Sequence, residues 1–374
     1  MNLIRRFTDS QPVSLPAPPT FTSLTVAYTT FWDWFTQRER TYFRAVQGGT
    51  HIQEAFFDDL SPAIDAVKEG LYFQAGMADD HTAELIISAE GAIENIVFAE
   101  ELVAAAPVLA EWKFTALKEA TPDIEQIVIH MADYEFRVNN IHFYPDDEAA
   151  YPDEIAIIVT HADLTEENHA TVENGTLIFL DTYLGELAFA TLVDQVTIVN
   201  ESQAQQPLVP ITKLRDFLIW RQKEFVEKYS GMRHETDNDT YATFTAERED
   251  GQQLIAIINT DLLEWDAKAS HPWVMVVTIP FDVTERNGMP DSKTYELLNQ
   301  LEDELIAELP NHEGFLNVGR QTASGSREIY FACQDFRKPS KVLYQFQTHY
   351  AETLALEYSL YKDKYWQTFE RFTP

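Results

Sequence analysis

Residues 274–279 form a nearly continuous run of apolar, mostly β-branched residues in the last third of the chain. His271-Pro272 precedes this run and Pro280 ends it. Such a run is typical of a strand that is covered on both faces, because both sides of its pleat are then apolar. We therefore expect a central strand here, and we interpret the neighbouring elements around it.

A helix with a leucine stripe follows this strand. Pro290 and Asp291 suit its first turn, the proline by its fixed φ and the aspartate by its charge near the helix N-terminus. Two alternating runs, 315–320 and 328–333, then flank a turn-rich loop and predict a hairpin. The stripe that predicts the helix consists of Leu298, Leu301, Leu305 and Leu309.

An amphipathic helix over about 339–350 and an alternating run over 354–360 complete the order β-α-β-β-α-β. This is the order of the ferredoxin-like split β-α-β unit, in which two helices cover one face of an antiparallel sheet. A long helix ending at Gly231 and a hairpin over 241–246 and 254–258 precede the unit and are expected to extend it. We therefore predict an α+β protein whose C-terminal domain is ferredoxin-like, a fold that hosts many functions.

A series of short motifs in this region also carries a family resemblance. In chain order they are His271-Pro-Trp-Val, Asn287-Gly-Met-Pro-Asp, Tyr295-Glu-Leu-Leu-Asn with Glu302-Asp303, Val318-Gly-Arg-Gln-Thr and Gly325-Ser-Arg-Glu-Ile-Tyr-Phe. Over roughly residues 240–372 the chain resembles the bacterial domain-of-unknown-function 695 family. The resemblance implies no activity, because that family has no established chemistry.

The remainder divides into a leader, an acidic domain and a linker. We expect an extended, proline-rich leader over residues 1–20, an α+β domain over 21–202, a linker over 203–210 and the C-terminal domain over 211–374. The acidic domain should begin with helices, over about 29–47, 50–68, 93–106 and 109–122. Its strands are expected at 71–75, 83–88, 127–130, 136–143, 155–161 and 196–199, and Gly175 argues against a continuous helix between the last two.

The formal net charge of −34 is concentrated in the first part of the chain. Residues 1–205 hold 9 basic and 34 acidic residues. Such a surface repels phosphate backbones and anionic membranes. We therefore expect neither direct nucleic-acid binding nor membrane association, whereas a basic protein is a partner that this charge would attract.

The composition also bounds the cellular location and the cofactors. Cys333 is the only cysteine, which excludes an internal disulfide and a multi-cysteine zinc site. Arg5 and Arg6 are followed by no hydrophobic stretch of the kind a signal peptide needs, and no apolar run has membrane-spanning length. We predict a cytoplasmic protein. Because the sequence contains no GxGxxG, Walker or GxSxG motif, we expect no cofactor. The oligomeric state is not determined by these features.

Four polar residues are the candidates for catalytic chemistry: Asp261, Glu264, Asp266 and His271. A histidine near several carboxylates can act as a general acid and base or hold a divalent metal. Their spacing matches no established ligand motif, so a polar crossover between two strands is the favoured alternative. If these residues form a site, at least three of them must converge in one pocket.

A second candidate is an anion-binding site at the predicted hairpin, formed by Arg320, Ser324, Ser326 and Arg327. A loop rich in glycine and serine between two arginines can bind an anion through backbone N–H groups and guanidinium forks. The alternative is an ordinary hairpin in which Arg320 pairs with Glu328 across the strands.

Two functions of different classes fit these observations. The first is a non-enzymatic binding or regulatory protein whose acidic half engages a basic partner, for example an inhibitor of a nuclease or toxin that mimics phosphate charge. The second is a metal-dependent or anion-binding enzyme centred on His271 or Arg320. The missing catalytic motifs favour the first function, and the sequence leaves the question of enzymatic activity open.

Overall fold

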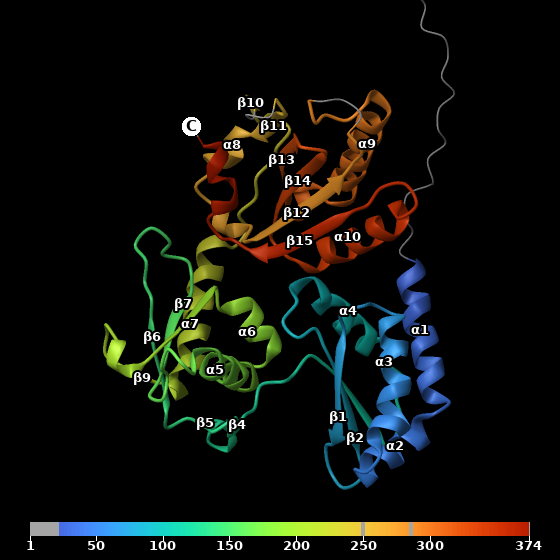
Figure 1. The fold of residues 1–374 in the computed structure, drawn as a ribbon, viewed down its shortest axis with the longest axis vertical. Coiled ribbons are helices and arrows are strands. Elements are labelled where there is room, and N and C mark those ends of the chain that lie inside the picture. Colours follow the sequence, from blue (N-terminus) through green and yellow to red (C-terminus); the bar gives the residue numbers. More distant parts are fainter. Residues whose placement is uncertain (1–21, 248–250, 284–286, 374) are drawn as a thin grey trace, which may run out of the picture.

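The computed structural model describes residues 22–247, 251–283 and 287–373. The leader expected over residues 1–20 lies outside these ranges. The protein is of the α+β type, and its described residues form three sheet-containing units that follow one another along the chain (Figure 1).

The first unit packs helices against a three-stranded sheet. Its elements are α1 (Thr22–Thr36), α2 (Glu39–Gly48), a π-helical segment (Gln53–Phe57), α3 (Asp58–Asp65), β1 (Tyr72–Met77), β2 (Ala83–Ser88), α4 (Ile93–Ala104) and β3 (Trp112–Ala116). The single helix expected over 29–47 is therefore two helices. β1 and β2 pair as an antiparallel hairpin, and α4 carries the chain back so that β3 lies parallel to β2.

The helix predicted over 109–122 was wrong, because this segment contains β3. Trp112 and Phe114 both turn towards the helices of the first unit, with nearly parallel rings 6.0 Å apart, while Lys113 between them is exposed. The strand is held by parallel pairing with β2, a partner distant in sequence. Pairing with a distant strand therefore overrode the weak helical spacing of the apolar residues.

The middle unit is built on a four-stranded sheet in the order β8-β7-β6-β9 with a separate small hairpin. Its elements are β4 (Ile129–Met131), β5 (Tyr134–Phe136), β6 (Ile141–Pro145), β7 (Ala156–His161), α5 (His169–Leu184), α6 (Glu186–Leu192), β8 (Gln195–Val199), β9 (Val209–Pro210) and α7 (Leu214–Tyr229). These elements enclose a hydrophobic core of their own.

Gly175 lies inside α5, which is continuous from His169 to Leu184, contrary to the prediction. A Cβ atom at this position would lie 2.2 Å from the ring of Phe136. Glycine is therefore present because the buried Phe136 ring packs directly on the helix backbone, and the cost of glycine in a helix is offset by this contact.

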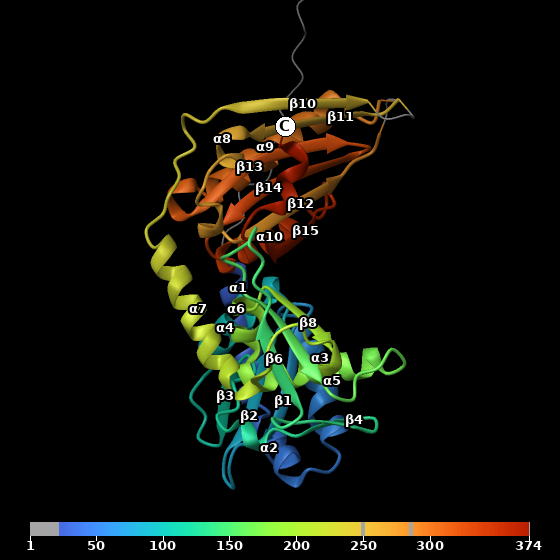
Figure 2. The ribbon, with the colours of Figure 1, turned by 90° about the vertical axis from the view of Figure 1, so that its left-hand side faces the viewer.

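The segment expected to be a linker, 203–210, carries β9, which pairs with β6. The helix after it, α7, was assigned to the C-terminal domain by the sequence. Its Leu214 and Leu218 are buried in the core of the middle unit. Figure 2 shows α7 running along one side of the molecule from the middle unit towards the C-terminal sheet.

The C-terminal unit contains a six-stranded sheet in the order β10-β11-β13-β14-β12-β15, with every neighbouring pair antiparallel. Its elements are β10 (Tyr241–Glu247), β11 (Gln253–Asn259), α8 (Thr260–Leu263), β12 (Trp273–Pro280), α9 (Ser292–Glu308), β13 (Phe315–Ala323), β14 (Ser326–Cys333), α10 (Arg337–Tyr350), β15 (Glu357–Lys362) and a 3-10 segment (Gln367–Phe372).

Both faces of β12 are covered, as its apolar run predicts. Met275 and Val277 pack with α9 and α10 on one face of the sheet. Val274 lies on the other face, in a core that the C-terminal segment closes with Trp366 and Phe369. β12 is therefore a central strand with apolar neighbours on both sides.

The first and C-terminal units share one continuous hydrophobic core, in which α4 faces α10. The rings of Phe98 and Tyr344 meet edge to face, 5.2 Å apart. Beside them Arg337 donates two hydrogen bonds to the Glu100 carboxylate, at 2.7 and 2.8 Å. Some acidic groups of the first unit are thus neutralised by basic side chains of the C-terminal unit. The bidentate geometry of the Arg337–Glu100 pair is a strong form of ion pair.

Candidate functional site

His271 lies in the protein interior, immediately before β12, with a fully buried side chain. Its Nδ1 is 2.8 Å from Ser270 Oγ, and this hydroxyl donates to the Ala267 carbonyl at 2.6 Å. The hydroxyl oxygen therefore accepts from Nδ1–H, which assigns the neutral tautomer with an unprotonated Nε2. Nε2 has no hydrogen-bond partner among the described residues. His271 is thus a neutral core histidine, packed against the ring of Trp265.

The three carboxylates predicted to join His271 lie elsewhere. Asp261 is exposed on the short helix α8 and accepts a hydrogen bond from the Thr240 backbone N–H at 3.0 Å, and Glu264 and Asp266 are also exposed. Within residues 22–247, 251–283 and 287–373 no three histidine, cysteine or carboxylate side chains are grouped as metal ligands. The structure therefore does not bring the four candidates together, because the side chains of Asp261 on α8 and of Glu264 and Asp266 after it are exposed, whereas His271 is buried.

Burial makes the stability of the fold depend on pH through His271. Burial lowers the pKa of this imidazole to about 3, and the charges of Arg233 and His234 act in the same direction. In the unfolded chain the group titrates near pH 6.5. Between these values the unfolded state binds a proton that the folded state does not bind, so stability falls as the pH decreases from about 6.5 towards 3.

When the pH is lowered from 7.5 to 5.0, we expect the free energy of unfolding of the wild-type protein to fall by about 2 kcal/mol more than that of a His271→Leu variant. This value follows from about 1.4 kcal/mol per pH unit below 6.5. Urea unfolding at the two pH values measures it. The apolar replacement removes the titrating group and leaves a side chain of similar size in the core. Equal losses in the two proteins would contradict this assignment.

The two arginines of the second candidate site do converge. Arg320 Nη1 donates to Glu302 Oε2 at 2.8 Å, and Arg327 Nη1 lies 4.0 Å from the same oxygen. Arg327 also donates from Nε to Thr322 Oγ1 at 3.1 Å and from Nη1 to Asn299 Oδ1 at 2.7 Å. The two guanidinium groups, from strands β13 and β14, are therefore held against one carboxylate of α9.

Both guanidinium groups line a cavity of about 230 Å³ between the sheet and α9. Its other walls are the ring of Tyr295 and a set of apolar side chains, Ile255, Ile257, Met289 and Pro290. Six strands spaced by about 4.8 Å span roughly 24 Å. Two helices of about 10 Å diameter cover only roughly 20 Å of this width. Strand β11, which the added hairpin places beside β13, is therefore incompletely covered by the helices. The cavity lies over this strand.

The charges at this cavity influence one another. Burial raises the pKa of Glu302, and the neighbouring charges of Arg320 and Arg327 oppose that rise. Burial also lowers the pKa of Arg327 to about 10, a direction that Arg320 reinforces and Glu302 opposes. With all three groups ionised the cluster carries one net positive charge, within a protein of formal net charge −34.

The two serines of the predicted anion site are not part of the cavity lining. Ser324 occupies the hairpin turn with a φ of +52°, and Ser326 begins β14. The alternative pairing of Arg320 with Glu328 is also wrong. In the observed register Arg320 lies opposite Ile329, so the side chain of Glu328 is on the other face of the sheet, where it accepts a hydrogen bond from Tyr330.

Sequence reasoning did not identify Glu302 as part of this site, although a signal was present. Glu302 is four residues beyond Leu298 and three before Leu305, so it occupies a position on the apolar stripe of α9. A carboxylate at a core-facing helical position requires a buried partner. The two arginines supply that partner.

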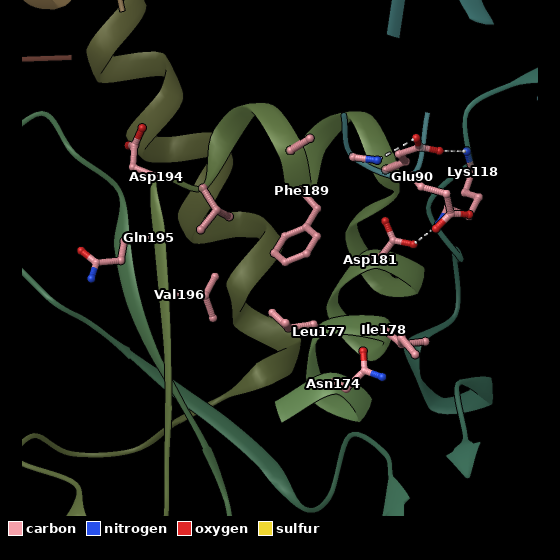
Figure 3. Close-up of a pocket in the computed structure, with 14 residues that line it drawn as sticks. Glu90, Lys118, Asn174, Leu177, Ile178, Asp181, Phe189, Asp194, Gln195 and Val196 are labelled. Atoms are coloured by element: carbon pink, nitrogen blue, oxygen red, sulfur yellow. Dashed lines mark hydrogen bonds and ion pairs between the residues drawn. The ribbon is translucent and has the colours of Figure 1, made fainter. Parts of the chain in front are cut away.

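A second cavity, of about 460 Å³, lies between the first and middle units (Figure 3). Lys118 forms ion pairs with Asp181 at 2.7 Å and with Glu90 at 3.5 Å at its rim. Leu177 from α5 and Phe189 from α6 also line this cavity. These three charged rim groups are paired with one another, so the cavity is primarily a feature of the interface between the two units.

Glu186, at the start of α6, connects the same two units. Its buried carboxylate accepts hydrogen bonds from the backbone N–H groups of Ala89 at 2.8 Å and Lys118 at 3.1 Å, and from Ser88 Oγ at 2.8 Å. A glutamate of the middle unit thus occupies an anion-binding loop of the first unit. The role of Glu186 is to hold the two units together.

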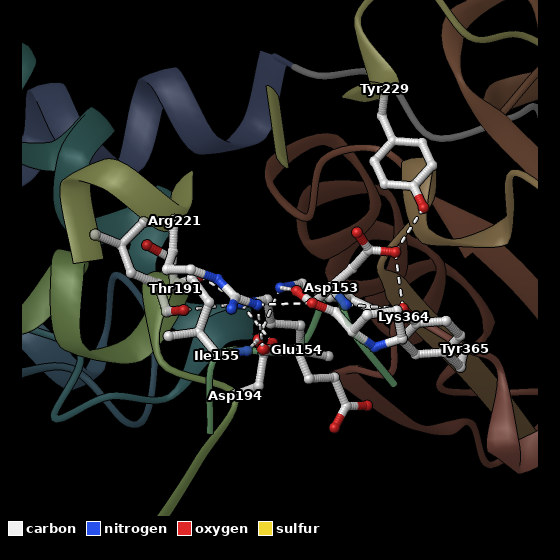
Figure 4. A network of polar contacts seen from close by, with 12 residues as sticks. Asp153, Glu154, Ile155, Thr191, Asp194, Arg221, Tyr229, Lys364 and Tyr365 are labelled. Atoms are coloured by element: carbon white, nitrogen blue, oxygen red, sulfur yellow. Dashed lines mark hydrogen bonds and ion pairs between the residues drawn. The ribbon is translucent and has the colours of Figure 1, made fainter. Parts of the chain in front are cut away.

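A network of buried charges joins the middle and C-terminal units (Figure 4). The Asp194 carboxylate lies between two ammonium groups, with Lys362 Nζ 2.7 Å from Oδ1 and Lys364 Nζ 2.7 Å from Oδ2. Burial lowers the pKa of Lys362 to about 8, and the charge of Asp194 opposes this change. Nearby, Asp153 Oδ2 accepts hydrogen bonds from the hydroxyls of Tyr229 and Tyr365, both at 2.7 Å.

Comparison with known families confirms the resemblance seen in the C-terminal part of the chain. The model of a family of unknown function, DUF695, matches residues 242–373. The chain has no significant match among curated proteins or solved structures. In the part of the chain that the structure describes, no helix combines the length and apolar character needed to cross a membrane.

Proposed function

We propose that the protein is a non-enzymatic cytoplasmic binding or regulatory protein whose acidic N-terminal part engages a basic protein partner. The match to a family of unknown function assigns no chemistry to the C-terminal part. The separation of His271 from Asp261, Glu264 and Asp266 gives no support to a metal-dependent enzyme at that place. The proposal rests on an exposed acidic segment of the first unit.

This acidic segment extends over residues 54–69, and it includes α3 and all but the first residue of the π-helical segment. Five of its carboxylates are exposed: Glu54, Asp58, Asp59, Asp65 and Glu69. Among ion pairs between described residues, only Glu54 of the five takes part, with His51 at 3.3 Å. The one basic residue of the segment, Lys68, is half-buried with its ammonium 5.6 Å from the Phe98 ring. The segment therefore presents largely uncompensated negative charge to solvent.

A surface of this kind attracts basic partners and repels nucleic acids. Complementary charge raises the rate of encounter and selects partners by sign, while the contribution of exposed charges is screened by salt. A basic protein that uses lysines and arginines to contact phosphate would meet a similar charge pattern here. An inhibitor of a nuclease or toxin is one form that such a protein would take.

The test is capture of proteins from native lysate by three forms of the chain. The first is the wild type. The second carries Glu54→Gln, Asp58→Asn, Asp65→Asn and Glu69→Gln in the acidic segment. The third is a control with the same charge change on exposed acidic residues of the C-terminal half, Glu235→Gln, Asp237→Asn, Glu296→Gln and Glu352→Gln.

We expect the wild type and the control to capture the same basic protein at about 50 mM salt and to lose it at about 500 mM, where the screening length is only a few ångströms. The acidic-segment variant should fail to capture it at either salt concentration. Capture that is equal for all three forms, or unaffected by salt, would refute the proposal.

We also propose that the C-terminal sheet is a ferredoxin-like split β-α-β unit to which the hairpin β10–β11 has been added. Two observations support this. Helix α9 joins β12 to β13 with β14 between them, and α10 joins β14 to β15 with β12 between them. Both connections thus skip one antiparallel strand, which is the defining feature of the split unit.

A further inference from the structure

We infer that the cavity beside α9 binds a small organic monocarboxylate with an apolar body, and that Arg320 and Arg327 hold its carboxylate. The cavity lies in the C-terminal unit and contains none of the residues of the acidic segment. The inference is therefore independent of the proposed protein partner, and each can fail without the other.

Arg327 has the features of an arginine that is positioned in advance for a ligand. Its side chain is only 1% exposed, and it is fixed by hydrogen bonds from Nε to Thr322 and from Nη1 to Asn299. Its guanidinium carbon also lies 5.3 Å from the centre of the Tyr295 ring. With the described residues, Nη2 forms no hydrogen bond. Nη2 is not enclosed by the protein's own atoms, and Arg327 lines the cavity, so an anionic ligand there would supply an acceptor for this donor.

Arg320 supplies further donors from the neighbouring strand. Its Nη1 is engaged by Glu302, and it makes no other hydrogen bond with the described residues. The side chain is 25% exposed, and it lines the same cavity as Arg327. Two guanidinium groups that converge on one space match the two oxygens of a carboxylate, which commonly accepts paired N–H donors.

The charge and the walls of the cavity restrict the ligand class. Two arginines and Glu302 leave one net positive charge, which a monoanion neutralises, whereas a phosphate dianion would place excess negative charge beside a buried carboxylate. Ile255, Ile257, Met289 and Pro290 form an apolar wall that suits a hydrocarbon or aromatic body. The volume of about 230 Å³ corresponds to seven or eight water molecules at ~30 Å³ each.

The rim of the cavity is held in place before any ligand binds. The loop that contributes Met289 is tied to β11 and to the turn between β13 and β14, because Gln253 N–H donates to the Asn287 carbonyl at 2.9 Å and Gly325 N–H donates to the Gly288 carbonyl at 3.0 Å. Asn287 Oδ1 also accepts from the Met289 backbone N–H at 3.1 Å. Such a preformed rim lowers the ordering cost of binding a small ligand.

Four of the five short motifs that carry the family resemblance contribute residues to this cavity. Met289 and Pro290 come from one and Tyr295 from the next, while Arg320 and Thr322 come from a third and Arg327 from a fourth, about 25 residues or more further along the chain. Their common position identifies this cavity, rather than the surroundings of His271, as the place where these residues act together.

Ligand-observed NMR titration of the full chain with benzoate tests the inference, since benzoate combines one carboxylate with an apolar ring of suitable size. We expect a dissociation constant on the order of 1 mM or below, within the range that so few non-hydrogen atoms allow. An Arg320→Gln variant, altered at a partly exposed position, should bind at least about tenfold more weakly, the usual cost of losing a charged hydrogen bond.

Two controls separate this site from general charge effects. Arg371→Gln removes an exposed arginine that pairs with Glu328 outside the cavity, and it should leave the affinity for benzoate unchanged. Benzamide, the uncharged analogue, should not bind. The inference is overturned if benzoate fails to bind at about 10 mM, if Arg320→Gln and wild type bind it equally, or if inorganic phosphate binds as tightly as benzoate.

Discussion

An Asp194→Ala variant is expected to unfold with a free energy about 3–5 kcal/mol lower than that of the wild type. Asp194 is the shared counter-ion of Lys362 and Lys364, and its Oδ2 also accepts the Ile155 backbone N–H at 2.6 Å. The Lys364 side chain is 2% exposed. Removing the carboxylate therefore leaves two adjacent ammonium groups without their compensating charge in a region that water does not reach freely.

Equilibrium urea unfolding, followed by tryptophan fluorescence, measures this effect. An Asp147→Ala variant is the matched control, because Asp147 also pairs with a base, Arg221, but is 71% exposed. Its replacement should change the stability by less than about 1 kcal/mol. A loss of similar size in both variants would show that the Asp194 pairs contribute no more than surface ion pairs.

A compensated variant sharpens the interpretation. When Asp194→Ala is combined with Lys362→Met and Lys364→Met, no unpaired charge remains at the interface, and we expect most of the lost stability to return. If stability stays low in the triple variant, the loss is due to the cavity and to the orphaned Ile155 N–H rather than to the uncompensated ammonium groups.

A Glu186→Ala variant is expected to lose about 3–4 kcal/mol of unfolding free energy, because it removes the acceptor of several buried donors at once. The carboxylate binds Ser88 Oγ and the N–H groups of Ala89 and Lys118. These donors belong to the first unit and Glu186 to the middle unit. The substitution should therefore loosen the contact between the two units as well as lower their stability.

Urea unfolding together with limited proteolysis of the chain near residue 118 would measure both effects. Glu186→Gln retains one acceptor oxygen and should lose roughly half as much stability. Glu173→Ala, which alters an exposed glutamate of α5 paired with His169 at 3.3 Å, serves as the control and should be nearly neutral. A Glu186→Ala protein as stable as this control would contradict the role assigned to the carboxylate.

The candidate site could be predicted only in part. The two arginines were identified from their position around a hairpin, and strand register then placed them on the helix-covered face of the sheet. The serines were included because the hairpin turn is rich in small polar residues, but Ser324 lies in the turn, Ser326 begins β14, and neither lines the cavity. The grouping of His271 with nearby carboxylates relied on sequence proximity alone, and in the structure all three carboxylates are exposed while His271 is buried.

The sequence by itself determined the properties that depend on local pattern and composition. These include the central strand 273–280, the helix behind its leucine stripe, the order of strands and helices after it, the concentration of acidic residues and the single cysteine. The period of the hydrophobic pattern and the composition depend on residues that are neighbours in the sequence, so they can be determined without knowledge of the fold.

Only the tertiary structure decided which distant residues meet. The pairing of Asp194 with Lys364 spans 170 positions, and that of Glu100 with Arg337 spans 237. Strand β3 and the continuous helix α5 around Gly175 likewise depend on partners far away, β2 and Phe136. A buried charge, a glycine or an ambiguous strand is explained by the group packed against it, and the identity of that group follows from the fold as a whole.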